Sequence, residues 1–209
     1  MLNRTRSTLV TALLVGTLSS GCTDADGGDG HGAGGSGLAG TGGSPSGDGS
    51  GTGGGLPVES TFPDAQAYVD AHNAVRAAVV EPSGYTGAWE PLPPVGWSDS
   101  VAESAQEWAN HLRDTQNCGL EHDVNSEYGE NLAAGTNLSP QGAVNMWAAE
   151  AARYTYSPSY VFESVTGHYT QIVWRDSIRI GCASADCGRS SVIVCRYSPP
   201  GNFIGERIY

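Results

Sequence analysis

The stretch Gly167–Trp174, which reads GHYTQIVW, indicates the fold of this chain most clearly, together with Tyr128–Leu132, which reads YGENL. In each stretch one polar side chain able to bind a metal, His168 or Glu130, stands among apolar and aromatic residues. A polar group in such surroundings is costly to bury unless it finds a partner. We therefore take the two stretches as the starting point for a functional site.

The first 22 residues have the features of a bacterial export signal. Two arginines, Arg4 and Arg6, precede an apolar run from residue 9 to residue 18, and small residues lead to Cys22. The run is shorter than the ~20 apolar residues of a membrane-spanning helix. The residues before Cys22 resemble a lipoprotein cleavage box, although Ser19 stands where leucine is usual. We expect a lipid on Cys22; the alternative is ordinary signal cleavage and full release.

A glycine-rich segment separates this signal from the part of the chain that can fold. Residues 23–60 contain 16 glycines in 38 positions and almost no large apolar residue, so they cannot bury enough surface to offset their chain entropy. We expect a disordered tether with a root-mean-square span of roughly 30–35 Å. Residues 61–209 then form one domain of ordinary size.

The charge of residues 61–209 limits the partners of this domain. It has 17 acidic residues and 8 arginines, a balance of −9 (8 − 17), and the chain has no lysine. Such a domain lacks the basic surface that nucleic acid requires, and purely electrostatic docking on anionic lipid is disfavoured. We therefore expect no nucleic-acid partner.

Four cysteines remain in the domain once Cys22 is assigned to the lipid. An even number in an exported domain is typical of disulfides. A zinc site would need clustered thiolates, and the spacing from Cys182 to Cys187 is too wide for the usual knuckle. We therefore expect disulfides among Cys118, Cys182, Cys187 and Cys195.

Hydrophobic spacing predicts helices in the first part of the domain and strands in the last part. Helices are expected from near Pro63 to before Pro82, from Ser98 or Ser100 to near Cys118, and from Ser139 and Pro140 onward. Strand-like runs follow at residues 169–174, 179–183 and 191–196, the last two joined by a turn at 186–188. Because the strands cluster late, we expect an α+β layered domain and not alternating βαβ units.

Two histidines and two glutamates are the candidates for chemistry: His122, Glu130, Glu150 and His168. No two of them have a recognised metal-binding spacing such as HExxH. From spacing alone, a hydrogen-bonded core histidine and an exposed helix acid are the simpler interpretations. Two histidines and two carboxylates can nevertheless form a divalent-ion site when a fold brings them together.

Six motifs follow one another along the domain. They are CGLEH at 118–122, YGENLA at 128–133, AVNMW at 143–147 followed by Glu150, GHYTQIVW at 167–174, IGCA at 180–183 and CRYSPPGN at 195–202. In order and spacing they resemble the CAP family, named for cysteine-rich secretory proteins, antigen 5 and pathogenesis-related proteins. The greatest resemblance is to the plant class-one pathogenesis-related proteins, and it covers nearly all of residues 64–209.

The resemblance implies a three-layer α-β-α sandwich with a central antiparallel sheet, the CAP or SCP fold. It also implies a shallow cleft lined by two histidines and two glutamates, which by motif position are His122, Glu130, Glu150 and His168. In related domains the two histidines can bind a divalent cation, often zinc. The glutamates would then orient the imidazoles, supply charge or bind through water.

The resemblance further implies two disulfides, Cys118–Cys187 and Cys182–Cys195. Plant relatives have a third bridge just before the GHY motif. Here Thr166 occupies one of its cysteine positions, and no cysteine occurs between residues 119 and 181. Because both members of that pair are missing, the whole bridge is absent.

One departure from the family concerns catalysis. Many relatives have serine directly after the histidine that matches His122, and here Asp123 stands there. A catalytic triad needs a nucleophile within hydrogen-bond reach of its base, and nothing marks Ser126 or Ser164 as a substitute. Hydrolysis through a serine is therefore disfavoured.

Our leading interpretation is an exported, non-catalytic monomer, tethered to the cell envelope, that binds a divalent cation and a lipid or sterol. Lipid and sterol binding is implied by the family resemblance alone. The alternative is a metal-assisted hydrolase of peptides or cell-wall material, with Glu130 or Glu150 as base. A third interpretation is signalling through the tail 195–209, which resembles a plant peptide segment although Ile208 replaces the usual proline; more simply, the tail packs into the fold.

Overall fold

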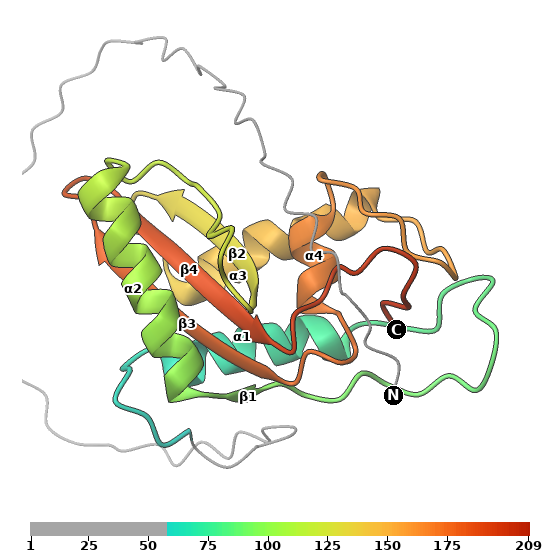
Figure 1. The fold of residues 1–209 in the computed structure, drawn as a ribbon. Coiled ribbons are helices and arrows are strands. Elements are labelled where there is room, and N and C mark those ends of the chain that lie inside the picture. The colour runs from blue at the N-terminus through green and yellow to red at the C-terminus, as the bar shows by residue number, and fades with distance from the viewer. Residues whose placement is uncertain (1–57) are drawn as a thin grey trace, which may run out of the picture. The chain divides into compact units, whose positions relative to one another are not determined.

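A computed structural model describes residues 58–209, and these form a four-stranded sheet between two layers of helices (Figure 1). The elements are α1 (Ala65–Ala77), β1 (Gly96–Trp97), α2 (Asp99–Thr115), β2 (Gly129–Gly135), α3 (Pro140–Ala148), the 3-10 helix η1 (Ala149–Arg153), α4 (Gly167–Ile172), β3 (Arg179–Asp186) and β4 (Ser191–Ser198). Helix α2 covers one face of the sheet, and α1, α3 and α4 cover the other. The predicted three-layer sandwich is therefore confirmed.

The predicted export signal, Cys22 and the tether up to residue 57 lie outside the described residues. Within residues 58–209, no helix is both long and apolar enough to cross a membrane.

The strand order in the sheet is β1-β3-β4-β2. Strands β2 and β3 both pair antiparallel with β4, and only the two-residue β1 is parallel to its neighbour β3. The turn between β3 and β4 lies where the sequence predicted it. Strand β2 was not predicted, and it forms the edge of the sheet beside which the site residues lie.

Side chains of the central strand β4 alternate between the two faces of the sheet, as pleating requires. Val192 and Val194 pack toward α2, whereas Ile193, Cys195 and Tyr197 belong to the larger apolar core on the other face. The same alternation places Arg196 on the α2 face.

Helix α2 lies directly on strand β3 because residue 181 is glycine. A Cβ atom at Gly181 would collide with the α2 backbone at Val101 and Ala102. The start of α2 is fixed by Ser98, whose Oγ accepts a hydrogen bond from the amide of Val101 at 3.5 Å. Of the two serines proposed for this helix start, Ser98 is the N-cap.

Residues 167–172 form the short helix α4, so the prediction of a strand at 169–174 was wrong. The cause is a cap from outside the segment: Glu150 Oε2 accepts hydrogen bonds from the amides of His168 (2.9 Å) and Tyr169 (3.1 Å). Two buried polar side chains also fix the helix. Thr170 donates to Asn202 at 2.7 Å, and Gln171 donates to Ser177 at 3.0 Å.

Both disulfides implied by the family resemblance are present. Cys182 and Cys195 are register partners on β3 and β4. The Cys118–Cys187 bridge joins the loop after α2 to the turn between β3 and β4. This second bridge anchors the loop that continues to His122.

Candidate functional site

The four predicted site residues form two histidine–glutamate pairs, and both pairs lie beside edge strand β2. His122 Nδ1 is 2.8 Å from Glu130 Oε1, and His168 Nδ1 is 2.7 Å from Glu150 Oε1. Glu130 is the second residue of β2. The next residue, Asn131, donates to the carbonyl oxygen of His168 at 3.1 Å. The fold therefore brings both pairs to the beginning of the same strand.

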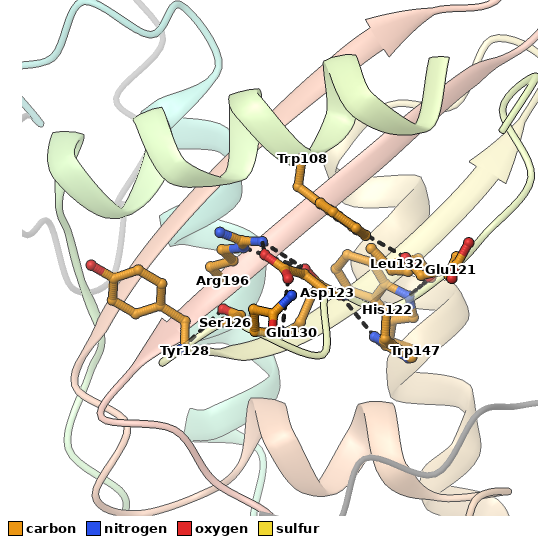
Figure 2. A network of polar contacts seen from close by, with 11 residues as sticks. Trp108, Glu121, His122, Asp123, Ser126, Tyr128, Glu130, Leu132, Trp147 and Arg196 are labelled. Carbon is orange, nitrogen blue, oxygen red and sulfur yellow. Dashed lines mark hydrogen bonds and ion pairs between the residues drawn. The ribbon is translucent and has the colours of Figure 1, made fainter. Parts of the chain in front are cut away.

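The His122 pair is held by a network of charged groups (Figure 2). Glu130 Oε1 also accepts from the amide of Asp123 at 3.2 Å, and Glu130 Oε2 lies 3.3 Å from both Nε and Nη2 of Arg196. Arg196 Nη2 in turn donates to Asp123 Oδ2 at 2.7 Å. Both oxygens of Glu130 are therefore occupied by donors from the protein.

Arg196 and its contact with Asp123 were not anticipated from the sequence. The signal that could have found them is the charge of Arg196 within the apolar run 192–197. A buried guanidinium there requires a carboxylate partner, and the register places Glu130 directly opposite it on β2.

The His168 pair is held from the helical layer. Glu150, in η1, accepts from His168 Nδ1 through Oε1 and caps α4 through Oε2. The indole of Trp147 stacks on the His168 ring, with centroids 6.2 Å apart and 19° between the planes. Trp147 Nε1 donates to the carbonyl oxygen of Leu132 at 2.9 Å, which fixes the indole against β2.

These contacts set the tautomer of both imidazoles. An ionised carboxylate only accepts hydrogen bonds, so each Nδ1 carries the proton and donates it to glutamate. In the neutral form of each ring, Nε2 then has a free lone pair, and neither Nε2 has a protein partner in residues 58–209. The side chains of His122 and His168 are 30% and 22% exposed. A carboxylate on one ring nitrogen and an accessible second nitrogen is the arrangement of metal-binding histidines.

The two glutamates are better placed to orient the histidines than to bind an ion themselves, because their oxygens already accept from the protein. In the part of the chain that the structure describes, no group of three or more His, Cys, Asp or Glu side chains is arranged to hold a metal. The two imidazole Nε2 atoms are therefore the ligands that these residues could offer to a cation.

The site carries a net negative charge. Arg196 offsets one of the two carboxylates Asp123 and Glu130, which leaves one negative charge beside His122. No arginine pairs with Glu150 within the described residues, which leaves a second negative charge beside His168. With both imidazoles neutral, the sum of two negative charges favours a divalent cation over an anion.

A buried polar chain connects the site to the core. Asn131 donates to Tyr197 Oη at 3.0 Å, and Tyr197 Oη lies 2.8 Å from His72 Nε2. His72 Nδ1 is 2.7 Å from the carbonyl oxygen of Tyr68. The pKa of His72 is lowered to about 4, mainly by burial; the hydrogen bond to Tyr68 opposes this effect, and the charge of Arg76 adds to it. His72 is thus neutral at pH 7 and supports the site structurally.

Neither serine considered from the sequence, Ser126 or Ser164, is placed as a nucleophile. Ser126 Oγ accepts a hydrogen bond from the amide of Tyr128 at 3.1 Å. Among residues 58–209, neither Ser126 nor Ser164 is hydrogen-bonded to a histidine. Asp123, which stands where relatives have serine, is engaged with Arg196.

A groove of about 410 Å³ runs between α1 and the segment from α3 to η1. Ala71, Ala74 and Val75 line it from α1, Ala78 from the residue that caps this helix, and Tyr169 from α4. These residues are mostly small and apolar, so the groove presents a hydrophobic surface. It lies close to the His168 pair, because Tyr169 is the residue directly after His168.

The C-terminal tail packs into the domain, as the simpler interpretation predicted. Ile208 and Tyr209 are 1% and 5% exposed, and the carbonyl oxygen of Ile208 accepts from the amide of Arg175 at 2.8 Å. The Tyr209 ring contacts Trp89 and Tyr156.

Several known proteins are similar to this chain in sequence or in architecture. The model of the cysteine-rich secretory protein family (CAP) matches residues 69–197. The chain is 44% identical over 150 residues to the PR-1 type pathogenesis-related protein of Sambucus nigra, covering 69% of this chain and 81% of that protein. The crystal structure of hookworm platelet inhibitor is similar at a TM-score of 0.54 and 23% identity, covering 74% of this chain and 79% of that one. A second crystal structure, that of NaASP2 with Zn²⁺, has a TM-score of 0.54 and 23% identity, covering 74% of this chain and 90% of that one.

Proposed function

The chain belongs to the cysteine-rich secretory protein (CAP) family, and on that premise we propose that it is an exported, non-catalytic module that binds a divalent cation and a lipid or sterol. The proposal of a cation site rests on the two imidazoles, each of which is oriented by a glutamate so that Nε2 is free and accessible. The two disulfides fit an oxidising compartment outside the cytoplasm.

Zinc is the first candidate ion. Imidazole nitrogen is a preferred ligand of zinc, and a structural relative of this fold was solved with Zn²⁺. His122 and His168 would hold the ion, with Glu130 and Glu150 behind them. When bound, the ion would offset the negative charge of the site and offer an open coordination position to a ligand.

Calorimetry with zinc tests this proposal. The exported protein should bind one zinc ion, and the double variant His122→Ala/His168→Ala should bind none. His111→Ala is the control, because His111 is an exposed histidine on α2 that is hydrogen-bonded to neither pair; its ring stacks on Trp108. Glu150→Gln should weaken zinc binding by about 10–100-fold, the usual effect of losing a group that orients a metal ligand. Equal zinc affinity in the double variant and in wild type would contradict the proposal.

The groove between α1 and α3 is the proposed lipid site. Its volume of about 410 Å³ lies in the range of roughly 300–1,000 Å³ of small-ligand sites, which are mostly apolar. We propose that the uncharged hydrocarbon part of the ligand occupies this groove, since alanine and valine side chains of α1 line it.

A blocking substitution tests the groove. Ala74→Trp should fill it and lower the affinity for a fluorescent fatty acid or a fluorescent sterol by at least about tenfold, because the ligand would have to displace a large side chain. Ala77→Trp is the matched control: Ala77 is also exposed on α1 but does not line the groove. Running both probes separates a fatty acid from a sterol as ligand. Equal affinity of Ala74→Trp and Ala77→Trp for both probes would refute the assignment.

Attachment to the cell envelope through Cys22 is proposed from the sequence alone. Growth of the producing cells with a labelled fatty acid should label the wild-type protein. Cys22→Ser should remove the label and shift the protein to the medium. Wild-type protein without label and fully released would show that the signal is an ordinary one.

The non-catalytic assignment rests on the occupied carboxylates and on the absence, among the described residues, of a serine bonded to either histidine. Zinc-loaded protein should therefore not turn over casein or peptidoglycan. Turnover that is abolished by Glu130→Gln would instead establish the metal-assisted hydrolase.

A further inference from the structure

Arg196 joins three elements that meet at His122. It lies on β4 with its side chain 6% exposed, and it contacts Glu130 of β2, Asp123 of the preceding loop and Ser104 of α2. Nε and Nη2 both approach the same oxygen of Glu130, while Nη2 also reaches Asp123. This use of several nitrogens depends on the planar guanidinium and cannot be reproduced by the single ammonium of lysine.

Asp123 directly follows His122, so the ion pair between Asp123 and Arg196 holds the loop at the residue next to His122. On the other side of His122, the carbonyl oxygen of Glu121 accepts from Trp108 Nε1 at 2.8 Å. The loop is thus held on both sides of His122, by an indole from α2 and by a guanidinium from β4 (Figure 2). Of these two attached groups, only Arg196 also contacts Glu130, the glutamate that is hydrogen-bonded to His122.

We propose that Arg196 and Asp123 are a positioning pair that presents His122 Nε2 to the cation. Arg196 holds Oε2 of Glu130, which leaves Oε1 for the proton on His122 Nδ1, and Asp123 fixes the backbone beside that imidazole. The pair thereby selects the tautomer whose Nε2 lone pair is free. This inference rests on the proposed cation site, but its central statement concerns the metal-free protein.

The pair also accounts for two carboxylates lying side by side next to His122. Asp123 is 18% exposed at its side chain and Glu130 is 7% exposed. Two carboxylates this close to one another and to the interior repel unless a cation lies between them. Arg196 is that cation: it contacts both carboxylates, and Oε1 of Glu130 is left to accept from His122.

The experiment compares Arg196→Lys and Asp123→Asn with a matched pair of controls, Arg113→Lys and Asp114→Asn. Arg113 and Asp114 form the same type of ion pair at 2.7 Å, but on the surface, with side chains 41% and 60% exposed. The first readout is nitrogen NMR of histidine-labelled protein without metal, with the His122 signals assigned from a His122→Gln variant. The second readout is the dissociation constant for zinc measured by calorimetry.

We expect wild type and both controls to show the Nδ1-protonated tautomer of His122 alone. Arg196→Lys and Asp123→Asn should show a mixture with the Nε2-protonated tautomer, and zinc should bind about 10–100-fold more weakly. The His168 tautomer should not change, since Glu150 does not contact Arg196. If Arg196→Lys does not fold, the isosteric Asp123→Asn still decides.

A purely structural role would lower the melting temperature and leave the His122 tautomer as in wild type. That result in Asp123→Asn, with a zinc dissociation constant within twofold of wild type, would overturn the positioning pair. If wild type binds no zinc but the tautomer changes as expected, the cation proposal fails and the positioning pair stands. The two ideas are thus decided by different measurements.

Discussion

Lowering the pH from 7 to 4 should destabilise the fold through His72, which is completely buried at the end of the polar chain behind the site. Its Nδ1 donates to the carbonyl oxygen of Tyr68, so its Nε2 accepts from the hydroxyl of Tyr197. Protonation would turn Nε2 from an acceptor into a donor. The hydroxyl of Tyr197 would then face two donors, Nε2 and the side-chain amide of Asn131. The folded protein therefore resists binding a proton that the unfolded chain takes up readily.

The magnitude follows from the two pKa values of His72, about 4 in the fold against 6.5 for the free side chain. Between these values the unfolded state binds more protons, so stability is complete above pH 6.5 and is lost as the pH falls. At about 1.4 kcal/mol per unit, the full loss is roughly 3 kcal/mol by pH 4. Other groups titrate in the same range, so the prediction concerns a difference between two proteins.

Urea unfolding followed by tryptophan fluorescence, with the disulfides intact, measures that difference. His72→Gln should be less stable than wild type at pH 7 by about 1–3 kcal/mol, since it disturbs buried hydrogen bonds. That gap should shrink by roughly 3 kcal/mol, and can reverse in sign, between pH 6.5 and pH 4. His111→Gln, at an exposed helix position, should keep a constant gap. A gap for His72→Gln that also stays constant over this range would refute the reasoning.

Three substitutions test other parts of the fold by the same unfolding assay. Gly181→Ala should cost at least about 1–3 kcal/mol, because its Cβ collides with the α2 backbone. Cys118→Ser/Cys187→Ser should cost about 4 kcal/mol in the chain-entropy view, for a bridge that spans 69 residues. Arg76→Met should cost at least about 3 kcal/mol, because the buried guanidinium donates hydrogen bonds to four backbone carbonyl oxygens.

Matched controls make these three values interpretable. Ser184→Ala is the control for the glycine, because it lies exposed on the same strand β3. Arg153→Met is the control for the buried arginine, because Arg153 is exposed. Reduction of wild type should reproduce at least the loss seen in the cysteine variant. A Gly181→Ala protein as stable as Ser184→Ala would show that α2 does not lie as closely on β3 as described.

The layers of the fold could be predicted because local signals and tertiary structure agree in most segments. Ser98 and Ser139 cap the helices whose starts they predicted, and the turn between β3 and β4 lies where Gly188 was expected to permit it. The run 169–174 failed because its aromatic and β-branched residues favour a strand, whereas the carboxylate of Glu150, distant in sequence, caps a helix there. Propensity alone cannot anticipate such a contact.

The grouping of the four candidate residues into two pairs beside β2 could be anticipated only through the family resemblance. No spacing connects His122 with Glu130 or Glu150 with His168, since each pair forms across separate elements. Strand β2 was missed because GENLAAG contains no β-branched or aromatic residue. Because β2 was not predicted, its pairing with β4 was not predicted either, and so the contact between Arg196 and Glu130 was missed.

The buried chain end has a practical consequence for work on this protein. Tyr209 packs among Trp89, Tyr154 and Tyr156, so an affinity tag fused after it would have to emerge from between aromatic rings. Such a fusion should melt at a lower temperature than the same protein tagged upstream of residue 58. Recombinant versions for calorimetry and NMR should therefore carry any tag upstream of residue 58.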